Sequence, residues 1–465
     1  MDILLTHGYF LGEDPAEAAV MKPYPPLGLL YITSYLKRLS LDVEVLDSTF
    51  LTRDEFMHHL RTCAPTLVGI YGTLMTRKNV LWITRAAKAL GAKVVLGGPE
   101  PVNYAEEYLD HGADVIVAGE GEQTLAELIP ILNSAGSDDL SRTAGIVFRT
   151  ESGTIERTAP RAQLPHLDEL PLPDREAIDV GRYQSVWRTH HGVSSVSLTT
   201  ARGCPYTCRW CSHSVYGFSH RRRSPENVAD ELEMLRDRYR PEQVWYTDDV
   251  FTINRRWLYR YAEELQRRNI RLPFETITRE DRLNERVAET LASMGCYRIW
   301  IGAESGSQSI LDAMDRRTDA ERMREMVRLL ARHGIRTGTF IMVGYDGETW
   351  RDINETARHL TESLPDDLLT TLAYPIKGTG YYDDVADRVL ARQPWAQSSD
   401  RDLTVTGRYS GRFYAHTQKW LRSELEAARM SNAPERSYLA LTKRRLVAKK
   451  HRAAMYLTRF ETERG

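Results

Sequence analysis

Three cysteines within eight residues are the clearest chemical signal in the chain. Cys204, Cys208 and Cys211 lie in the segment Gly-Cys-Pro-Tyr-Thr-Cys-Arg-Trp-Cys. Thiolates are the standard ligands of iron–sulfur clusters, and three local cysteines leave one iron of a four-iron cubane open to bind a substrate. A Cys3His zinc site that includes nearby His213 is the alternative, but the spacing is not the paired Cys-x2-Cys of a usual structural zinc site. The motif therefore favours a [4Fe–4S] cluster.

The cysteine motif follows the first strand of a long strand–helix series. Helices such as 225–239, 255–268 and 319–333 separate its strands. The strands are expected at 195–200, 243–247, 273–278, 297–302, 336–343 and 368–373. Six such units favour a partial (β/α)6 barrel, which places chemistry at the carboxyl ends of its strands.

Residues 1–140 form a separate alternating series. Strands are expected at 3–6, 43–46, 67–71, 93–96 and 114–117, with helices near 27–39, 53–62, 77–90, 103–110 and 123–133. This alternation predicts an α/β domain with a doubly wound, parallel, Rossmann-like sheet. Glycine turns follow three strands, at Gly72-Thr73, Gly97-Gly98-Pro99 and Gly119-Glu120-Gly121-Glu122. Such turns let a ligand approach the backbone, or they only turn the chain.

Composition shifts suggest the domain boundaries. A hairpin at 144–157 and the proline-rich stretch from Pro160 to Pro173 indicate a linker over 141–185. We expect the partial barrel over 186–385 and a mainly helical region over 386–465, because the strand signal fades there. This last region is basic near 443–452. A run of this kind is typical of a solvated helix face, and binding of an anionic substrate or partner is the alternative.

The bulk numbers exclude several classes of protein. Among 465 residues, 42% are hydrophobic and 27% charged, and the net charge is −2, which gives no reason to expect nucleic-acid binding. No run approaches the ~20 apolar residues of a membrane span, and no signal peptide is visible, so we expect a cytoplasmic enzyme. Five cysteines do not make a disulfide scaffold, and Cys63 and Cys296 read as small buried hydrophobic residues.

The cysteine motif resembles that of the radical SAM superfamily, with Trp210 just before the third cysteine. The resemblance covers about residues 190–380 and includes polar or glycine-rich ends of four further strands. It implies contacts of S-adenosylmethionine (SAM) with Asp248, Asp249, Arg279, Gly302, Glu304, Ser305 and Gly344. Acidic Asp248 or Asp249 and basic Arg279 would orient its amine and carboxylate. Tyr206 is a candidate proton or hydrogen donor, with packing beside the cluster as the alternative. A flavodoxin or ferredoxin is the implied electron donor.

Residues 1–380 together resemble the cobalamin-binding branch of these enzymes, the group with anaerobic magnesium-protoporphyrin ester cyclase and several hopanoid and natural-product methylases. The segment Pro25-Pro26-Leu27-Gly28-Leu29-Leu30-Tyr31 and the glycine turns carry the likeness. It implies cobalamin contacts at Gly72, Thr73, Gly97, Gly98, Gly119, Glu120 and Gly121. The Asp-x-His-x-x-Gly motif is absent, which argues against a lower histidine ligand. Glu100 stands where relatives often have histidine, and a cofactor-free domain that only packs on the barrel is the alternative.

The resemblance implies a cobalamin-dependent methyltransferase that acts on an unactivated carbon of a small molecule. One SAM would supply the methyl group through cobalamin, and a second would be cleaved to a 5′-deoxyadenosyl radical that removes hydrogen. Two alternatives stay open. The same machinery can perform oxidative cyclisation or rearrangement without methyl transfer, or the chain can be a metal-binding module without catalysis.

Overall fold

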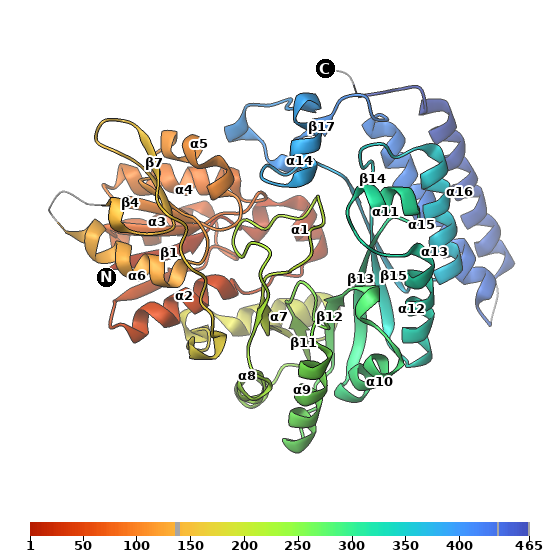
Figure 1. The fold of residues 1–465 in the computed structure, drawn as a ribbon, viewed down its shortest axis with the longest axis horizontal. Helices are drawn as coiled ribbons and strands as arrows, with labels where there is room; N and C mark the ends of the chain where they lie inside the picture. Colours follow the sequence, from red (N-terminus) through yellow and green to blue (C-terminus); the bar gives the residue numbers. More distant parts are fainter. Residues whose placement is uncertain (135–139, 435–436, 464–465) are drawn as a thin grey trace. The chain divides into compact units, whose positions relative to one another are not determined.

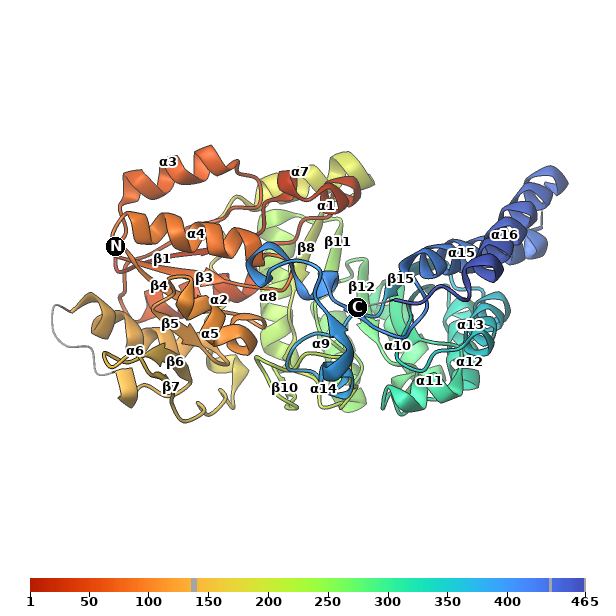
Figure 2. The same cartoon turned by 90° about the horizontal axis from the view of Figure 1, so that it is seen from above.

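The computed structural model describes residues 1–134, 140–434 and 437–463 (Figure 1). By its internal contacts the chain divides into two compact units. The first contains residues 1–205, 212–245 and 393–399, and the second contains 206–211, 246–392 and 400–465. The predicted boundaries at 140, 185 and 385 stay predictions. In Figure 2 the first unit contains the red and orange elements α2 to α6, and the second contains α9 to α16.

The first unit contains the expected doubly wound sheet. Five parallel strands form at β1 (Ile3–His7), β2 (Val43–Leu46), β3 (Leu67–Tyr71), β4 (Lys93–Gly97) and β5 (Val115–Val117). Their order is β2-β1-β3-β4-β5, so the chain reverses its direction of travel across the sheet at β1. The carboxyl ends of β1 and β3 therefore border the topological switch point, where open α/β sheets bind their ligands.

Helices cover both faces of this sheet. Leu29 and Leu36 of α2 (Leu27–Arg38) and Leu125 of α6 (Gly121–Asn133) pack in one hydrophobic cluster with the strands. A second cluster joins the strands to α3 (Arg53–Cys63), α4 (Arg77–Ala89) and α5 (Ala105–Asp110). A capping box of Thr52 and Glu55 begins α3, because the threonine oxygen accepts the Glu55 amide and the glutamate accepts the Thr52 amide.

The predicted hairpin is present, and it extends the first sheet. Strands β6 (Ile146–Arg149) and β7 (Ile155–Arg157) pair antiparallel, and β6 pairs antiparallel with β5. The apolar residues of β6 belong to the hydrophobic clusters of the first unit. The hairpin is thus part of the core of the first unit and not a free linker.

All six strands expected in the second series form. They are β8 (Ser195–Leu198), β11 (Gln243–Tyr246), β12 (Phe274–Thr278), β13 (Cys296–Glu304), β14 (Arg336–Val343) and β15 (Asp367–Leu372). In the second unit β12 to β15 pair as successive parallel neighbours. Among the described residues no strand pairing closes this array into a complete barrel, as expected for a partial one.

Helices alternate with these strands and then continue to the end of the described chain. The alternating helices are α7 (Val180–His191), α8 (Pro225–Tyr239), α9 (Arg255–Arg267), α10 (Glu285–Met294), α11 (Gln308–Ala313), α12 (Ala320–Arg332) and α13 (Trp350–Ser363). After α14 (Gly380–Val385), two long helices, α15 (Gly411–Asn432) and α16 (Tyr438–Thr458), confirm the predicted helical region. None of the described helices is long and apolar enough to cross a membrane.

Candidate active site

The second half of the cysteine motif is bonded to other parts of the second unit through both backbone groups of Arg209. The Arg209 amide donates to the Met314 carbonyl at 3.1 Å, and the Arg209 carbonyl accepts the Tyr381 amide at 2.7 Å. Trp210 packs against a hydrophobic cluster that contains both Met314 and Tyr381. These contacts hold the backbone between Cys208 and Cys211, so the aromatic residue in the motif has a structural role as an anchor.

Arg279, at the carboxyl end of β12, lies beside Cys208. Its Nη1 is 3.8 Å from the Cys208 Sγ, and its guanidinium stacks on the Tyr206 ring at 3.8 Å. Nε donates to Asp281 at 3.0 Å and Nη2 donates to the Arg316 carbonyl at 2.8 Å. Burial raises the pKa of the Cys208 thiol, and the Arg279 charge lowers it. The arginine is buried and fixed, so its cation opposes the cost of burying a thiolate.

Glu304 ends β13 with its carboxyl group in the same region. The residue has a left-handed φ of 60° at a register shift in the pairing of β13 with β14. An added Cβ at Gly302 would lie 2.5 Å from Glu304 Oε1, so only glycine leaves room for this carboxyl group. Burial, and then the Glu280 carboxylate, raise the pKa of Glu304 to about 8. A cationic or hydroxyl-bearing ligand would favour its ionised form.

The loop after β11 reaches the end of β12. The Phe251 amide donates to the Ile277 carbonyl at 3.0 Å, and the hydroxyl groups of Thr252 and Thr278 bond to each other. Asp248 is buried at 2% exposure, whereas Asp249 is exposed. The loop that carries Asp248 and Asp249 is therefore bonded to the strand end that precedes Arg279, and contacts of the two carboxylates with SAM stay a prediction.

Ser305 and Gly344 use their polar groups within the protein. The Ser305 hydroxyl bonds to Thr356 and accepts the Ser307 amide. The Gly344 amide donates to Glu348 at 2.6 Å, and an added Cβ there would lie 2.6 Å from Leu372. These contacts explain both residues by packing, and a SAM contact for either stays a prediction.

Tyr206 is held among charged side chains. Arg282 Nε donates to its hydroxyl group, which also bonds Asp281 at 3.4 Å. Burial raises the pKa of the phenol. The ring is also covered by Arg279. These contacts suit a residue that packs and positions its neighbours, and its role as a hydrogen donor stays a prediction.

Sequence reasoning missed Arg316. Its guanidinium donates to the Gly302 carbonyl at 2.7 Å, and its own carbonyl accepts Arg279. The side chain is buried and lies 3.7 Å from Glu280 Oε2. Arg316 thereby joins the ends of β12 and β13, although it lies in a loop after α11 where no strand-end pattern indicates it.

The donor set fits an iron–sulfur cluster better than zinc. None of the five cysteines forms a disulfide, and Cys208 and Cys211 are half-buried and exposed, respectively. A tetrahedral zinc site draws its ligand atoms to within about 4 Å of one another. Among the described residues the only such compact group of three His, Cys, Asp or Glu ligands is Glu44, His59 and Cys63, which contains no motif cysteine. Accessible thiols beside a fixed cation suit the larger cubane.

In the first unit, the glycine turns meet at the carboxyl edge of the sheet. The Gly72 amide donates to the Gly97 carbonyl at 2.8 Å. Gly98 has a φ of 105°, and an added Cβ would lie 2.4 Å from the Gly72 carbonyl oxygen. Thr73 is tied to Thr76 through its amide at 3.0 Å. The two turns thus form one continuous edge that needs glycine for its own backbone contacts.

The turn after β5 serves an ion-pair network. Glu120 accepts hydrogen bonds from Arg202 at 2.6 Å and Arg221 at 2.7 Å. Gly119 has a φ of 102°, and an added Cβ at Gly121 would lie 2.8 Å from Ile32. Both Glu120 carboxylate oxygens are engaged, so the predicted cobalamin contact at this residue gains no support beyond its position.

The edge between β1 and β3 carries exposed apolar side chains. Tyr71 and Met75 expose 37% and 41% of their surfaces there, next to the Gly72 turn. Gly8, which sequence reasoning missed, follows β1 at the switch point, and its added Cβ would lie 3.0 Å from Thr76. His7 also ends β1, but Asp47 and Ser48 bond its two ring nitrogens. The edge suits a corrin that receives no histidine ligand.

Glu100 has a structural role. It pairs with the buried Arg77, and the Tyr108 hydroxyl donates to it. The Arg77 guanidinium stacks on Trp395 at 4.9 Å, which fastens the segment 393–399 to the first unit. A buried arginine requires a carboxylate partner, which explains an acidic residue at this position.

Comparisons with known proteins match both halves of this geometry. A B12-binding domain model matches residues 17–129, and a radical SAM superfamily model matches 198–360. An uncharacterised methyltransferase of Pyrococcus horikoshii is 27% identical over 402 residues, which cover 83% of this chain and 85% of the relative. Anaerobic magnesium-protoporphyrin IX monomethyl ester cyclase of Synechocystis is 26% identical over 374 residues, 78% of this chain and 73% of the cyclase.

Solved structures establish the fold. The radical SAM methyltransferase TsrM of Kitasatospora setae, with cobalamin and a [4Fe-4S] cluster bound, superposes with a TM-score of 0.72 at 18% identity, over 97% of this chain and 99% of that one. The cobalamin-dependent radical SAM enzyme OxsB gives 0.74 at 17% identity, over 98% and 72%. This chain therefore combines a B12-binding domain with a radical SAM domain in the fold of the cobalamin-dependent radical SAM enzymes, and the cofactors of these two domains are cobalamin, a [4Fe–4S] cluster and SAM.

Proposed function

We propose that this enzyme methylates an unactivated carbon of a small-molecule substrate. The observation that carries the proposal is that one chain contains two candidate cofactor sites. One is the glycine-rich edge at the β1–β3 switch point, and the other is the Arg279 and Glu304 pair around Cys208. Relatives named as methyltransferases support it.

Cys204, Cys208 and Cys211 are the proposed cluster ligands, and the glycine edge is the proposed cobalamin site. When bound, the cluster supplies the electron that cleaves SAM to a 5′-deoxyadenosyl radical, and cobalamin supplies methyl-transfer chemistry. The chain itself holds Cys208 beside a cation that is 3% exposed and therefore cannot rotate away. Arg279 thus stabilises negative charge at the thiolate.

The strand ends orient SAM in this proposal. The Asp248 and Asp249 carboxylates attract its amine, and Arg279 attracts its carboxylate. Glu304, whose pKa burial raises to about 8, accepts hydrogen bonds from a hydroxyl or ammonium group once it is ionised. Arg316 holds the backbone under Glu304 through the Gly302 carbonyl. Buried groups of opposite charge at fixed positions favour one orientation of a zwitterionic ligand.

The test is anaerobic reconstitution of the full chain with iron, sulfide, hydroxocobalamin and a reductant. SAM with a deuterated methyl group is supplied together with metabolite extract from cells that lack the gene. Methylation predicts a product with one added, deuterium-labelled methyl group. The alternative, oxidative cyclisation, has a named relative in its favour and predicts 5′-deoxyadenosine with an unlabelled product that has lost hydrogen.

The matched variants are two single cysteine replacements. Cys208→Ala is expected to lose the cluster absorbance and all 5′-deoxyadenosine. Cys296→Ala removes a buried thiol at the start of β13 and is expected to retain both. If Cys208→Ala kept the cluster and the nucleoside, the ligand assignment would be wrong. A labelled product from wild type alone supports methylation, and deoxyadenosine without label in any product contradicts it.

A further inference from the structure

Helix α16 carries two apolar stripes on opposite sides. Leu441, Ala448 and Met455 recur every seven residues and are buried, and Ala448 and Met455 pack in the cluster that contains α15 residues. A second stripe faces outward. Its exposed fractions are 87% for Leu439, 61% for Leu446 and 78% for Leu457, and Phe460, just beyond the end of the helix, is 78% exposed. At 100° per residue, the outward leucines lie roughly opposite the buried stripe. A solvated helix face has no physical reason to expose such a row.

The same helix concentrates positive charge. Residues 437–460 contain seven lysines and arginines and no aspartate or glutamate, so the rest of the chain carries a net charge of −9 against the total of −2. Arg444 pairs with Glu426. Within the described residues, Lys443, Lys449 and Lys450 have no carboxylate within ion-pair distance. On the helix these lysines flank the outward leucines on both sides.

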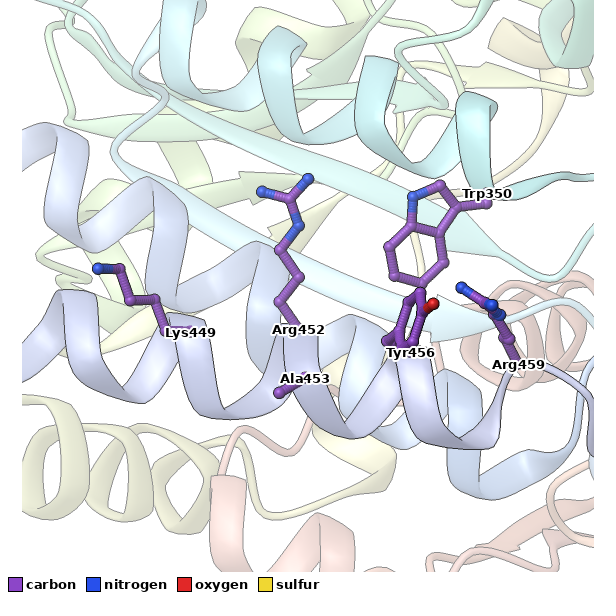
Figure 3. Close-up of a pocket in the computed structure, with 6 residues that line it drawn as sticks. All are labelled: Trp350, Lys449, Arg452, Ala453, Tyr456 and Arg459. Carbon is purple, nitrogen blue, oxygen red and sulfur yellow. The ribbon is translucent and has the colours of Figure 1, made fainter.

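A basic pocket of 590 Å³ adjoins this face (Figure 3). Lys449 and Arg452 of α16 and Arg459, which caps that helix, supply its cations, and Tyr456 and Trp350 supply its aromatic walls. Trp350 comes from the start of α13, so two elements of the second unit build the pocket. Arg459 also lies over the Tyr456 ring at 3.5 Å.

We propose that α16 binds the surface of an anionic lipid bilayer, with the leucine row inserted among the acyl chains and a headgroup phosphate in the basic pocket. An exposed apolar row flanked by lysines, with aromatic rings at its border, is what an interfacial helix requires. Nucleic acid would use the cations but not the aliphatic row. A second copy of the same face would repel the first.

The experiment is co-sedimentation of the reconstituted holoenzyme with phosphatidylcholine vesicles, with and without phosphatidylglycerol. Wild type is expected to bind only the anionic vesicles, and less at high salt. The triple variant Lys443→Gln, Lys449→Gln, Lys450→Gln is expected to bind about 100-fold more weakly, from roughly fivefold per cation. Replacing Leu446 and Leu457 by Ser is expected to weaken binding at least tenfold.

Matched controls carry the same changes elsewhere. Arg61, Lys78 and Arg256 are exposed on other helices and are replaced together by Gln, and Leu39 and Leu90 are replaced by Ser. Both control variants are expected to bind like wild type. Equal binding by test and control variants would overturn the proposal. The proposal would also be overturned if the chain bound RNA or an acidic protein and the leucine changes left that binding unaffected. A dimer that the leucine changes dissociate would overturn it as well. Failure of vesicle binding leaves SAM cleavage unaffected, so it is separable from the proposed function.

A separate cluster in the first unit supports a second inference. His59 and Cys63 lie one turn apart on α3, and Glu44 lies on the edge strand β2. His59 Nε2 is 2.6 Å from Glu44 Oε1 and 3.2 Å from Cys63 Sγ, and Cys63 Sγ is 3.8 Å from both Glu44 oxygens. Cys63 is thus half-buried beside polar groups, and the expectation of a buried hydrophobic residue is wrong.

The three side chains offer the ligand types of a zinc site within reach of one ion. Tetrahedral zinc with ordinary bond lengths sets ligand atoms roughly 3.3 to 3.6 Å apart. The sulfur lies 3.2 Å from the His59 nitrogen and 3.8 Å from the Glu44 oxygens, close to that range, whereas the 2.6 Å separation of His59 and Glu44 is a hydrogen bond that an ion would replace. We infer that Glu44, His59 and Cys63 bind a zinc ion, with solvent as the fourth ligand. The ion would fasten α3 to the edge of the sheet.

Zinc alone, in competition with a chromophoric chelator, tests this site on the holoenzyme with its cluster already assembled. Wild type is expected to bind one zinc ion that Cys63→Ala weakens at least ~100-fold. His58→Ala, next to His59 but exposed, is the control and is expected to retain the ion. Equal zinc affinity in wild type and Cys63→Ala would refute the site. A variant without Cys204, Cys208 and Cys211 should still bind the ion, and its failure to do so would also refute it.

Discussion

Replacing Arg279 by Gln should raise the pKa of the Cys208 thiol in the cluster-free protein. The guanidinium Nη1 is 3.8 Å from the sulfur. At that distance, with an effective dielectric constant near 20, a unit charge contributes about 4 kcal/mol at most. Cys208 is only half-buried, and solvent screens the pair, so we expect loss of the cation to destabilise the thiolate by about 1 kcal/mol, which is roughly a fivefold slower alkylation at pH values below the pKa. Because burial already raises this pKa, the variant moves it further up.

The assay is the pH dependence of Cys208 alkylation, measured anaerobically by peptide mass spectrometry. Arg279→Lys keeps a cation and should retain much of the low-pH reactivity. Arg282→Gln is the matched control, because Arg282 contacts Tyr206 and Asp281 but not Cys208. Identical alkylation profiles for wild type and Arg279→Gln, or a profile for Arg282→Gln shifted as far, would refute the reasoning. Reconstituted Arg279→Gln should also form less 5′-deoxyadenosine than wild type.

Three further predictions concern the scaffold. Burial raises the pKa of Glu348 to about 8, so the folded chain holds a proton on Glu348 that the unfolded chain loses, and it loses stability as the pH rises from about 5 to 8. Glu348→Gln should therefore be up to ~4 kcal/mol more stable than wild type at pH 9, measured by urea unfolding. An advantage no larger at pH 9 than at pH 5 would contradict this. Gly98→Ala places a Cβ 2.4 Å from the Gly72 carbonyl oxygen. The strain should lower the free energy of unfolding by about 1–3 kcal/mol and reduce cobalamin retention. An unchanged melting temperature would argue against the strain. Glu100→Ala removes the carboxylate that pairs with the buried Arg77 and should lower the free energy of unfolding by about 3–5 kcal/mol. A change under 1 kcal/mol in thermal unfolding would disprove this.

The sequence by itself determined the elements and the cysteine chemistry. Short apolar runs that alternate with helical stretches marked both strand series, and the structure confirms those strands because buried parallel strands leave little choice of residue. The cysteine spacing is local in the chain, so it was readable without a fold. Asp248, Arg279 and Glu304 stand at predicted strand ends for the same reason.

Only the tertiary structure decided which polar groups are available. Glu120 and Gly344 occupy predicted site positions, yet Glu120 bonds to Arg202, which is distant in sequence, and the Gly344 amide bonds to Glu348, which the turn after β14 brings back to it. Arg316 joins the site from a loop without any strand-end signal. The outward leucines of α16 became visible only when its other face was seen packed, since the helical period alone does not say which of two apolar stripes is buried.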